Sequence, residues 1–204
     1  MRVIALVLVV GVLGLGFAAW RSQTPQGPPV AATEPGSGAA GRASSSPDAG
    51  SLDSSGPGLS WSVPKRWQVL PERPMRIATY ALPATGGDRH DGECAVFYFG
   101  PGQGGEVDAN IERWIGQFVN PRVASRGSRD VHGIRVSRVE VSGTYLAPSG
   151  PAMESKERLD RYGLIGAIAE GPNGRVFFKL TGPAATLAKA RHEFESLVNS
   201  IHRS

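Results

Sequence analysis

The sequence predicts an α+β domain in which two amphipathic helices cover a mainly antiparallel β-sheet. Apolar segments of strand length follow one another across short turns, a pattern that is typical of antiparallel hairpins. Two other segments repeat their apolar residues at the spacing of a helix that buries one face. The predicted order β-β-β-α-β-β-β-β-α groups the strands together, so a doubly wound parallel sheet is not expected.

The strands are expected at residues 59–62, 75–82, 93–99, 123–131, 134–146, 162–170 and 175–182. The continuously apolar run at 93–99 is typical of a central strand. His132-Gly133 has the composition of a tight hairpin turn between an arginine-rich segment and a long strand. In that long strand the apolar alternation changes frame near Ser137, which predicts a β-bulge. Residues 148–160 are expected to form a loop.

The clearer of the two helices is expected at residues 107–118. Carboxylates at its start complement the helix dipole, and Asn120-Pro121 is expected to end it. Its apolar stripe consists of Val107, Ile111, Trp114, Ile115 and Phe118. The other helix is expected after Pro183, which suits a first helical turn. Its stripe consists of Leu187, Ala190, Phe194, Leu197, Val198 and Ile201.

Two segments precede the globular domain, which is expected over residues 59–204. Residues 3–20 are all apolar or small, and a helix of that length nearly spans the ~30 Å hydrocarbon core of a membrane. Residues 1–20 therefore predict either an uncleaved signal anchor or a cleaved signal peptide. Residues 21–58 are rich in Pro, Gly, Ser and Ala and predict a disordered linker, because so few apolar side chains cannot offset the entropy of ordering.

Both alternatives for the N-terminal segment predict export. With an anchor, the chain would be a single-pass protein of the cell membrane with its domain on the extracytoplasmic (periplasmic) side. With a cleaved signal, it would be secreted or periplasmic. The chain has a net charge of +4 and one cysteine, Cys94, which cannot form an internal disulfide. Export argues against a nucleic-acid partner.

A glycine-rich loop precedes the first expected helix. Gly100, Gly102 and Gly105 match the dinucleotide-binding pattern G-x-G-x-x-G. The surroundings do not fit, because no Lys or Arg follows within the loop and no parallel strand ending in an acidic residue returns. A phosphate about 6 Å from one carboxylate would be repelled by roughly 3 kcal/mol at an effective dielectric of ~20, more than a helix N-terminus returns. No cofactor is expected. The candidate interaction loop consists of Gly100, Gly102, Gly104, Gly105, Glu106 and Asp108.

The remaining candidates for chemistry are weak. His90, Asp91, Glu93 and Cys94 offer metal-ligand atoms, but no second histidine lies at a useful spacing. Cys94 should also face away from Glu93 on a strand. The chain has no nucleophile-elbow or zinc-protease motif, and no carboxylate pair stands out as a general acid and base. No catalytic residue and no metal site are therefore assigned.

Five arginines surround the expected edge hairpin and form a candidate basic surface, which could bind an anionic surface such as lipid. They are Arg122, Arg126, Arg129, Arg135 and Arg138. Asp130 and Glu140 interrupt the surface. The alternative is a solvated edge hairpin, in which arginines discourage pairing with other sheets.

Several stretches resemble an uncharacterised family of exported bacterial proteins: MRIATYALP, ECAVFYFGPGQGGEVDANIERWIGQF, VSGTY, YGLIGAIAE and FFKLTGPAATLAKARHEFESLVNSI. The most specific stretch has the pattern FGxGxGGxVxxNIxRW. The element order and the ending F-F-K-L-T-G-P…F…L…S-I are similar to the PsbP-like α/β/α sandwich. The resemblance implies that fold and a mostly non-catalytic, extracytoplasmic role in binding or assembly. It assigns no site residue.

These features favour a membrane-tethered or secreted non-catalytic domain that binds a protein partner or supports an envelope assembly. The partners would be an envelope protein and, with an uncleaved anchor, the cell membrane. The alternative is an enzyme of unknown reaction that binds a small ligand or a metal near His90, Glu93 or the glycine loop.

Overall fold

The structure, a computed structural model, describes residues 52–149 and 155–204, which belong to the unit Ser46–Ser204. The expected membrane segment at residues 1–20 and the expected linker up to residue 51 lie outside the described residues. Within the part of the chain that is described, no helix is long and apolar enough to cross a membrane.

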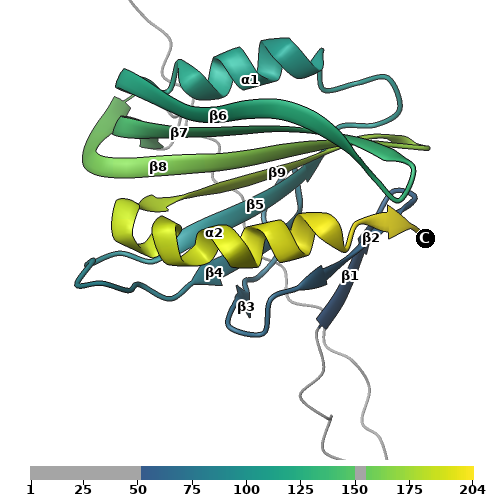
Figure 1. Cartoon of the computed structure of the whole chain (residues 1–204), viewed down its shortest axis with the longest axis horizontal. Coiled ribbons are helices and arrows are strands. Elements are labelled where there is room, and N and C mark those ends of the chain that lie inside the picture. Colours follow the sequence, from purple (N-terminus) through teal and green to yellow (C-terminus); the bar gives the residue numbers. More distant parts are fainter. Residues whose placement is uncertain (1–51, 150–154) are drawn as a thin grey trace, which may run out of the picture. The chain divides into compact units, whose positions relative to one another are not determined.

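A seven-stranded antiparallel sheet lies between the two helices (Figure 1). Its strand order is β3-β4-β5-β9-β8-β7-β6. The strands are β3 (Gln68–Val69), β4 (Arg76–Leu82), β5 (Gly92–Tyr98), β6 (Phe118–Val131), β7 (Ile134–Ser149), β8 (Ser155–Gly171) and β9 (Gly174–Pro183). The predicted α+β class, with a mainly antiparallel sheet between two helices, is confirmed.

A smaller sheet has the order β1-β2-β10. Its strands are β1 (Leu52–Gly56), β2 (Leu59–Val63) and β10 (His202–Arg203). β1 lies inside the range 21–58 that was expected to be linker, so the predicted domain start at residue 59 is corrected: residues 52–58 also belong to the domain. The composition of β1 conceals it, because the strand is held by backbone pairing to β2 rather than by apolar side chains.

One face of the large sheet is covered by helix α2 (Ala184–Asn199) together with the small sheet. Trp61 of β2 packs edge-on against Phe178 of β9 at 5.1 Å, and its indole N–H donates to the hydroxyl of Tyr80 at 3.0 Å. The start of α2 is capped from a distant loop, since Asp88 accepts hydrogen bonds from the backbone N–H and the hydroxyl of Thr186 at 2.7 and 2.8 Å. This face is thus closed across most of its width.

The other face is covered by helix α1 (Val107–Ile115), which packs on β6, β7 and β8. The helix ends at Ile115, three residues earlier than predicted, and the N–H of the following Gly116 donates to the Glu112 carbonyl at 2.8 Å. Phe118 begins β6 but still packs in the core beneath α1. Asn120-Pro121 does not end the helix. It lies in β6, where the pairing register shifts and Asn120 has a φ of 51°.

The predicted bulge at Ser137 is absent, because the pairing of β7 is regular there. Ile134 and Val136 face the α2 side, whereas Val139 and Val141 face the α1 side. The frame change therefore reflects burial of β7 on both faces.

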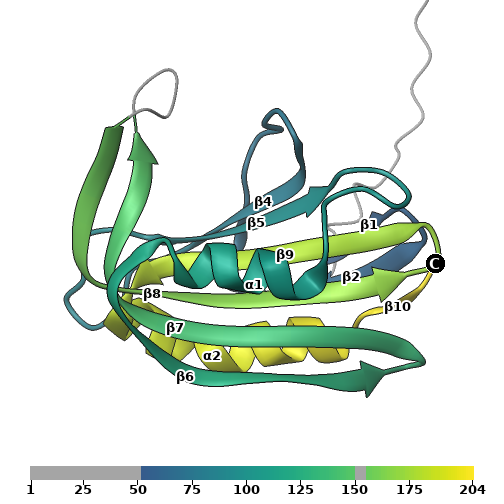
Figure 2. The ribbon, with the colours of Figure 1, turned by 90° about the horizontal axis from the view of Figure 1, so that it is seen from above.

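The predicted loop at residues 148–160 is also corrected. Both strands continue through most of this range, pairing as far as Ser149 and Ser155 (Figure 2). The register shift in this hairpin lies at Arg161, whose φ is 56°.

Two glycines of β8 allow the helices to approach the sheet closely. A Cβ at Gly163 would lie 2.9 Å from Leu187 of α2, and a Cβ at Gly166 would lie 2.3 Å from the ring of Trp114 of α1. Neither distance is possible for a real Cβ, so each glycine is required by the helix above it.

Replacing Gly166 by alanine should therefore force the Trp114 ring out of the core. We expect Gly166→Ala to lower the free energy of unfolding by roughly 1–3 kcal/mol, as over-packing does. Chemical denaturation followed by circular dichroism measures the change.

Gly127→Ala is the matched control, because nothing lies within 4 Å of a Cβ there and the residue is in the edge strand β6. Its effect should stay within about 0.5 kcal/mol. An equal loss in both variants would show that the effect comes from strand glycines in general and not from contact with Trp114.

Candidate functional site

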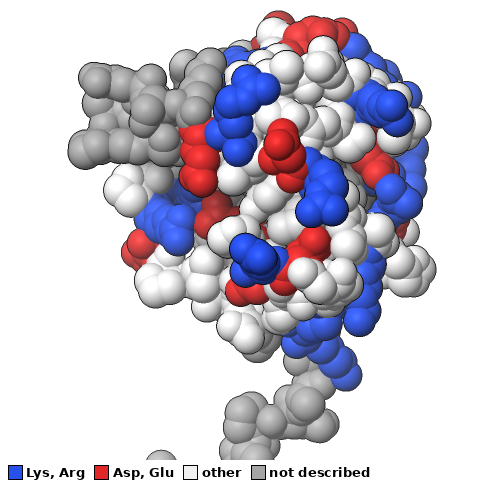
Figure 3. Space-filling model, turned by 90° about the vertical axis from the view of Figure 1, so that its left-hand side faces the viewer, with Lys and Arg blue, Asp and Glu red and all other residues white. Residues whose placement is uncertain are grey.

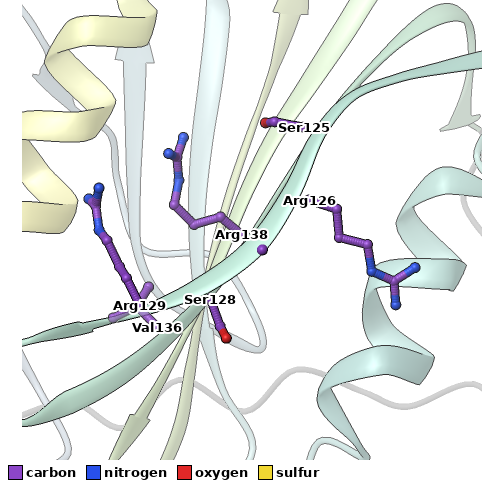
Figure 4. A pocket seen from close by; sticks show the side chains of 7 residues that line it. Ser125, Arg126, Ser128, Arg129, Val136 and Arg138 are labelled. Carbon is purple, nitrogen blue, oxygen red and sulfur yellow. The ribbon is translucent and has the colours of Figure 1, made fainter.

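The arginines of the predicted basic surface lie on the edge strand β6 and on its neighbour β7, and they point to both faces of the sheet. Arg126 points toward α1, whereas Arg129 and Arg138 point toward α2 (Figure 4). The structure does not bring the five arginines into one patch. On the side of the domain seen in Figure 3, positive and negative side chains lie next to one another.

Carboxylates of the helices neutralise most of these arginines. Arg126 contacts Glu112 at 2.5 Å and Asp108 at 3.1 Å, and these two carboxylates raise the pKa of its guanidinium. On the other face, Glu195 of α2 pairs with both Arg129 and Arg138. The arginines thus link the edge strand to both helices. Where these pairs are exposed, as at Arg126 and Asp108, water and salt screen them, so they position side chains more than they stabilise the fold.

A cavity of about 240 Å³ lies beside these arginines. It is lined by Ser125, Arg126, Gly127, Ser128, Arg129, Val136 and Arg138. Burial lowers the pKa of Arg138, and its Nε has no hydrogen-bond partner in the described residues. Arg135 is exposed and lies 3.8 Å from Glu170, and Arg122 is also exposed. Because Glu195 already pairs with Arg129 and Arg138, the cavity offers little free positive charge.

The glycine loop is a tightly held corner between β5 and α1. Gly100, Gly102, Gly104 and Gly105 all have positive φ values. A Cβ at Gly104 would lie 2.8 Å from Phe177, so the backbone lies directly on that ring. The carbonyl of Gly104 accepts from the buried amide of Asn110 at 2.8 Å. The sequence hypothesis missed Asn110, although a polar residue inside an apolar helical stripe is a signal for such a role.

The carboxylates of the predicted interaction loop also have partners within the domain. Glu106 pairs with Arg175 at 3.1 Å, and Asp108 pairs with Arg126. Beside the loop is an open recess of about 470 Å³, lined by Phe99, Gln103, Gly104, Gly105 and Arg113. Among the described residues, Arg113 has no ion-pair partner. The charge that the loop presents at this recess is therefore positive.

The residues considered for a metal site are separated by the sheet. Cys94 is buried in the core on the α2 side, where burial raises the pKa of its thiol. Glu93 faces the other side and pairs with Arg73 at 3.0 Å and Arg76 at 2.7 Å. The predicted opposition of Cys94 and Glu93 is confirmed. No three His, Cys, Asp or Glu side chains of the described residues form a group that could hold a metal ion.

The structure brings together a polar cluster that the sequence hypothesis missed. Lys179 of β9 donates to the Tyr145 hydroxyl at 3.1 Å, and its ammonium lies 5.5 Å from the centre of that ring. Burial, reinforced by the charge of Arg76, lowers the pKa of Lys179 to about 8. Burial raises the pKa of Tyr145 to about 12. A signal was available, since Lys179 is a charge that directly follows the apolar run Val176-Phe177-Phe178 and precedes Leu180.

Aromatic rings continue this cluster toward the glycine loop. The guanidinium of Arg76 lies 5.6 Å from the centre of the Phe97 ring, which stacks on Phe99 at 6.2 Å. Phe99 is 39% exposed and contacts Phe177 edge-on. We call this surface the open face, and it consists of Arg76, Glu93, Phe97, Phe99, Tyr145 and Lys179. It connects the polar cluster to the recess at Arg113.

No family model matches the chain, and no curated protein matches it. The fold resembles that of cyanobacterial PsbP from Synechocystis sp. PCC 6803, with a TM-score of 0.53 at 10% identity over 80% of this chain and 98% of that one. A protein of unknown function from Pseudomonas aeruginosa, described as a candidate regulator, matches with a TM-score of 0.48 at 13% identity over 76% of this chain and 97% of that one. The predicted PsbP-like fold is supported by the first of these similarities.

The low pKa of Lys179 implies a pH-dependent cost to stability. The folded protein releases this proton near pH 8, whereas the unfolded chain holds it to about pH 10.5, so native stability should rise with pH between these values. We expect Lys179→Met to raise the free energy of unfolding at pH 7, by at most roughly 3 kcal/mol. The difference from the natural protein should shrink as the pH rises above about 8.

Urea denaturation between pH 7 and pH 10 measures this difference. Lys189→Met is the matched control, because Lys189 is exposed on α2 and its removal should give a difference that does not change with pH. A constant difference for Lys179→Met as well would show that burial does not disfavour the charged form of Lys179.

Proposed function

We propose that this chain is a non-catalytic, extracytoplasmic domain, membrane-tethered or secreted, that binds an acidic segment of a protein partner on its open face. The extracytoplasmic location is supported by the apolar segment at residues 3–20 and the polar linker that follows it. A reporter enzyme that is active only outside the cytoplasm, fused after Ser204, tests this location. An inactive reporter would contradict it.

The observation that carries the proposal is the unequal covering of the large sheet. On the α2 side, the helix and the small sheet bury the strands from β4 to β7 in one core. On the α1 side, the helix packs on β6, β7 and β8, while Phe97 and Glu93 of β5 remain half-buried and Phe99 is exposed. Aromatic side chains at a solvent-accessible surface are typical anchors of protein interfaces.

The charge of the open face selects an acidic partner. Arg73, Arg76 and Lys179 gather around one carboxylate, Glu93. Arg113 adds a fourth cation at the recess beside Phe99. The five arginines of β6 and β7 form a larger group, but three of them, Arg126, Arg129 and Arg138, are paired with carboxylates of the helices. The excess of positive charge therefore lies on the open face, where an acidic segment could follow it from Arg113 to Lys179.

In-cell photo-cross-linking tests the proposal with the full-length chain. With p-benzoylphenylalanine at Phe99, we expect one recurrent adduct whose cross-linked peptide is rich in Asp and Glu. Arg113→Glu and Arg76→Glu should each reduce the adduct at least about fivefold, because a reversed charge repels an acidic segment. Thermal unfolding of both variants checks that they fold.

The same cross-linker at Val123 is the control, because Val123 is 47% exposed on the distant edge strand β6. Arg122→Glu and Arg135→Glu should leave the Phe99 adduct unchanged. Adducts that are equally strong from Val123, or that map to segments without acidic residues, would refute the open face as the binding surface.

A further inference from the structure

Lys179 makes no direct ion pair, although the other half-buried cations of the domain do. Arg76 and Arg138 each pair with a glutamate in the structure. For Lys179, by contrast, no carboxylate lies within 4 Å among the described residues, and its printed contact is the neutral hydroxyl of Tyr145. A buried ammonium without a direct ion-pair partner is costly, and proteins normally pair such groups.

We infer that the Lys179 ammonium is the binding site, here called the seat, for a carboxylate group of the acidic segment. This inference rests on the proposed function and names the residue that would hold the partner. A lysine ammonium has three N–H donors, and Tyr145 takes one of them. The remaining two donors suit a carboxylate, and an ion pair formed at a partly desolvated site is stronger than one in water.

The neighbours of Lys179 support an incoming anion rather than an internal one. Arg76 approaches from β4, Glu93 from β5 and Tyr145 from β7. Tyr162 of β8 stacks on Tyr145 at 6.2 Å, and Arg73 contacts Glu93 from the loop before β4. Glu93 is already shared by two guanidiniums. The cluster therefore has three cations for one carboxylate, and a second carboxylate would restore balance.

The seat gives binding a pH dependence that can be assigned to one group. Of the groups that face Lys179, the tyrosines have raised pKa values, whereas that of Lys179 lies at about 8. A bound carboxylate should raise this value, and linkage then requires affinity to fall as the pH passes above it. If binding raises the pKa by about one unit, affinity falls about sevenfold between pH 7 and pH 9.5.

Nuclear magnetic resonance of the full-length chain labelled with ¹³C-lysine tests the inference directly. The Cε signals of the four lysines are titrated alone, with a decaglutamate peptide and with succinate. We expect the peptide to raise the pKa of Lys179 by about one unit and to leave Lys189 unchanged. Affinity for the peptide should fall about tenfold for Lys179→Met at pH 7, and Lys179→Arg should keep the affinity and lose its pH dependence between pH 7 and 9.5.

The outcomes separate the inference from the proposed function. If the peptide binds but neither the pKa of Lys179 nor the affinity of Lys179→Met changes, the seat is overturned and the open face stands. If succinate raises the pKa of Lys179 and the peptide does not bind, the carboxylate seat is supported and the acidic protein partner is overturned. If neither probe acts, both are overturned.

Discussion

The close approach of one helix to each face of strand β8 is the constraint on which the rest of the structure depends. Gly163 and Gly166 lie three residues apart, so they face opposite sides of the sheet. Gly163 admits Leu187 of α2, and Gly166 admits Trp114 of α1. Because residues 163–169 of β8 are all buried, the neighbouring strands must divide their apolar side chains between two cores. This is why β7 changes its apolar frame without a bulge.

The same constraint leaves part of the sheet open. A helix with its side chains is about 10 Å wide, which corresponds to two or three strands at ~4.8 Å spacing. Seven strands span roughly 29 Å, so the nine-residue α1 over β8 cannot reach β4 and β5. On the α2 side the small sheet supplies the missing cover. On the α1 side, the side chains of Arg76 and Lys179 lie over aromatic rings instead. The rings and the aliphatic stems make this surface apolar, and the guanidinium and ammonium groups make it positively charged.

The sequence predicts the parts of the fold that depend on local patterns. The stripe from Val107 to Ile115 and the turn at His132-Gly133 are each contained within a few residues, so both are recognisable without the partner strand. The length of the β7–β8 hairpin cannot be recognised in this way, because its outer part is polar and is held by backbone pairing.

The candidate site is less accessible to sequence reasoning. Glu93 and Cys94 are separated correctly, since alternation along one strand decides their faces. The pairing of Glu195 with Arg138 and the meeting of Lys179 with Tyr145 depend on the register of strands far apart in the chain. The arginines of β6 are easy to see in the sequence, but their carboxylate partners come from both helices. These partners neutralise the arginines, so the arginines do not form the free basic surface that the sequence suggests.

The neutralised arginines of β6 also bear on how the domain could bind another protein. A sheet offers either its edge or its face, and β6 is a long exposed edge. Its pairing is interrupted by two register shifts, and Pro121 lacks an N–H. Arginines along such an edge further discourage strand addition. The edge is therefore protected, while Lys179 on the open face and Arg113 at the adjoining recess make no ion pair among the described residues, and Phe99 between them is exposed. An unpaired, partly buried lysine lowers stability below pH 8, and a cost of this kind is expected where a surface is built for a ligand rather than for the fold.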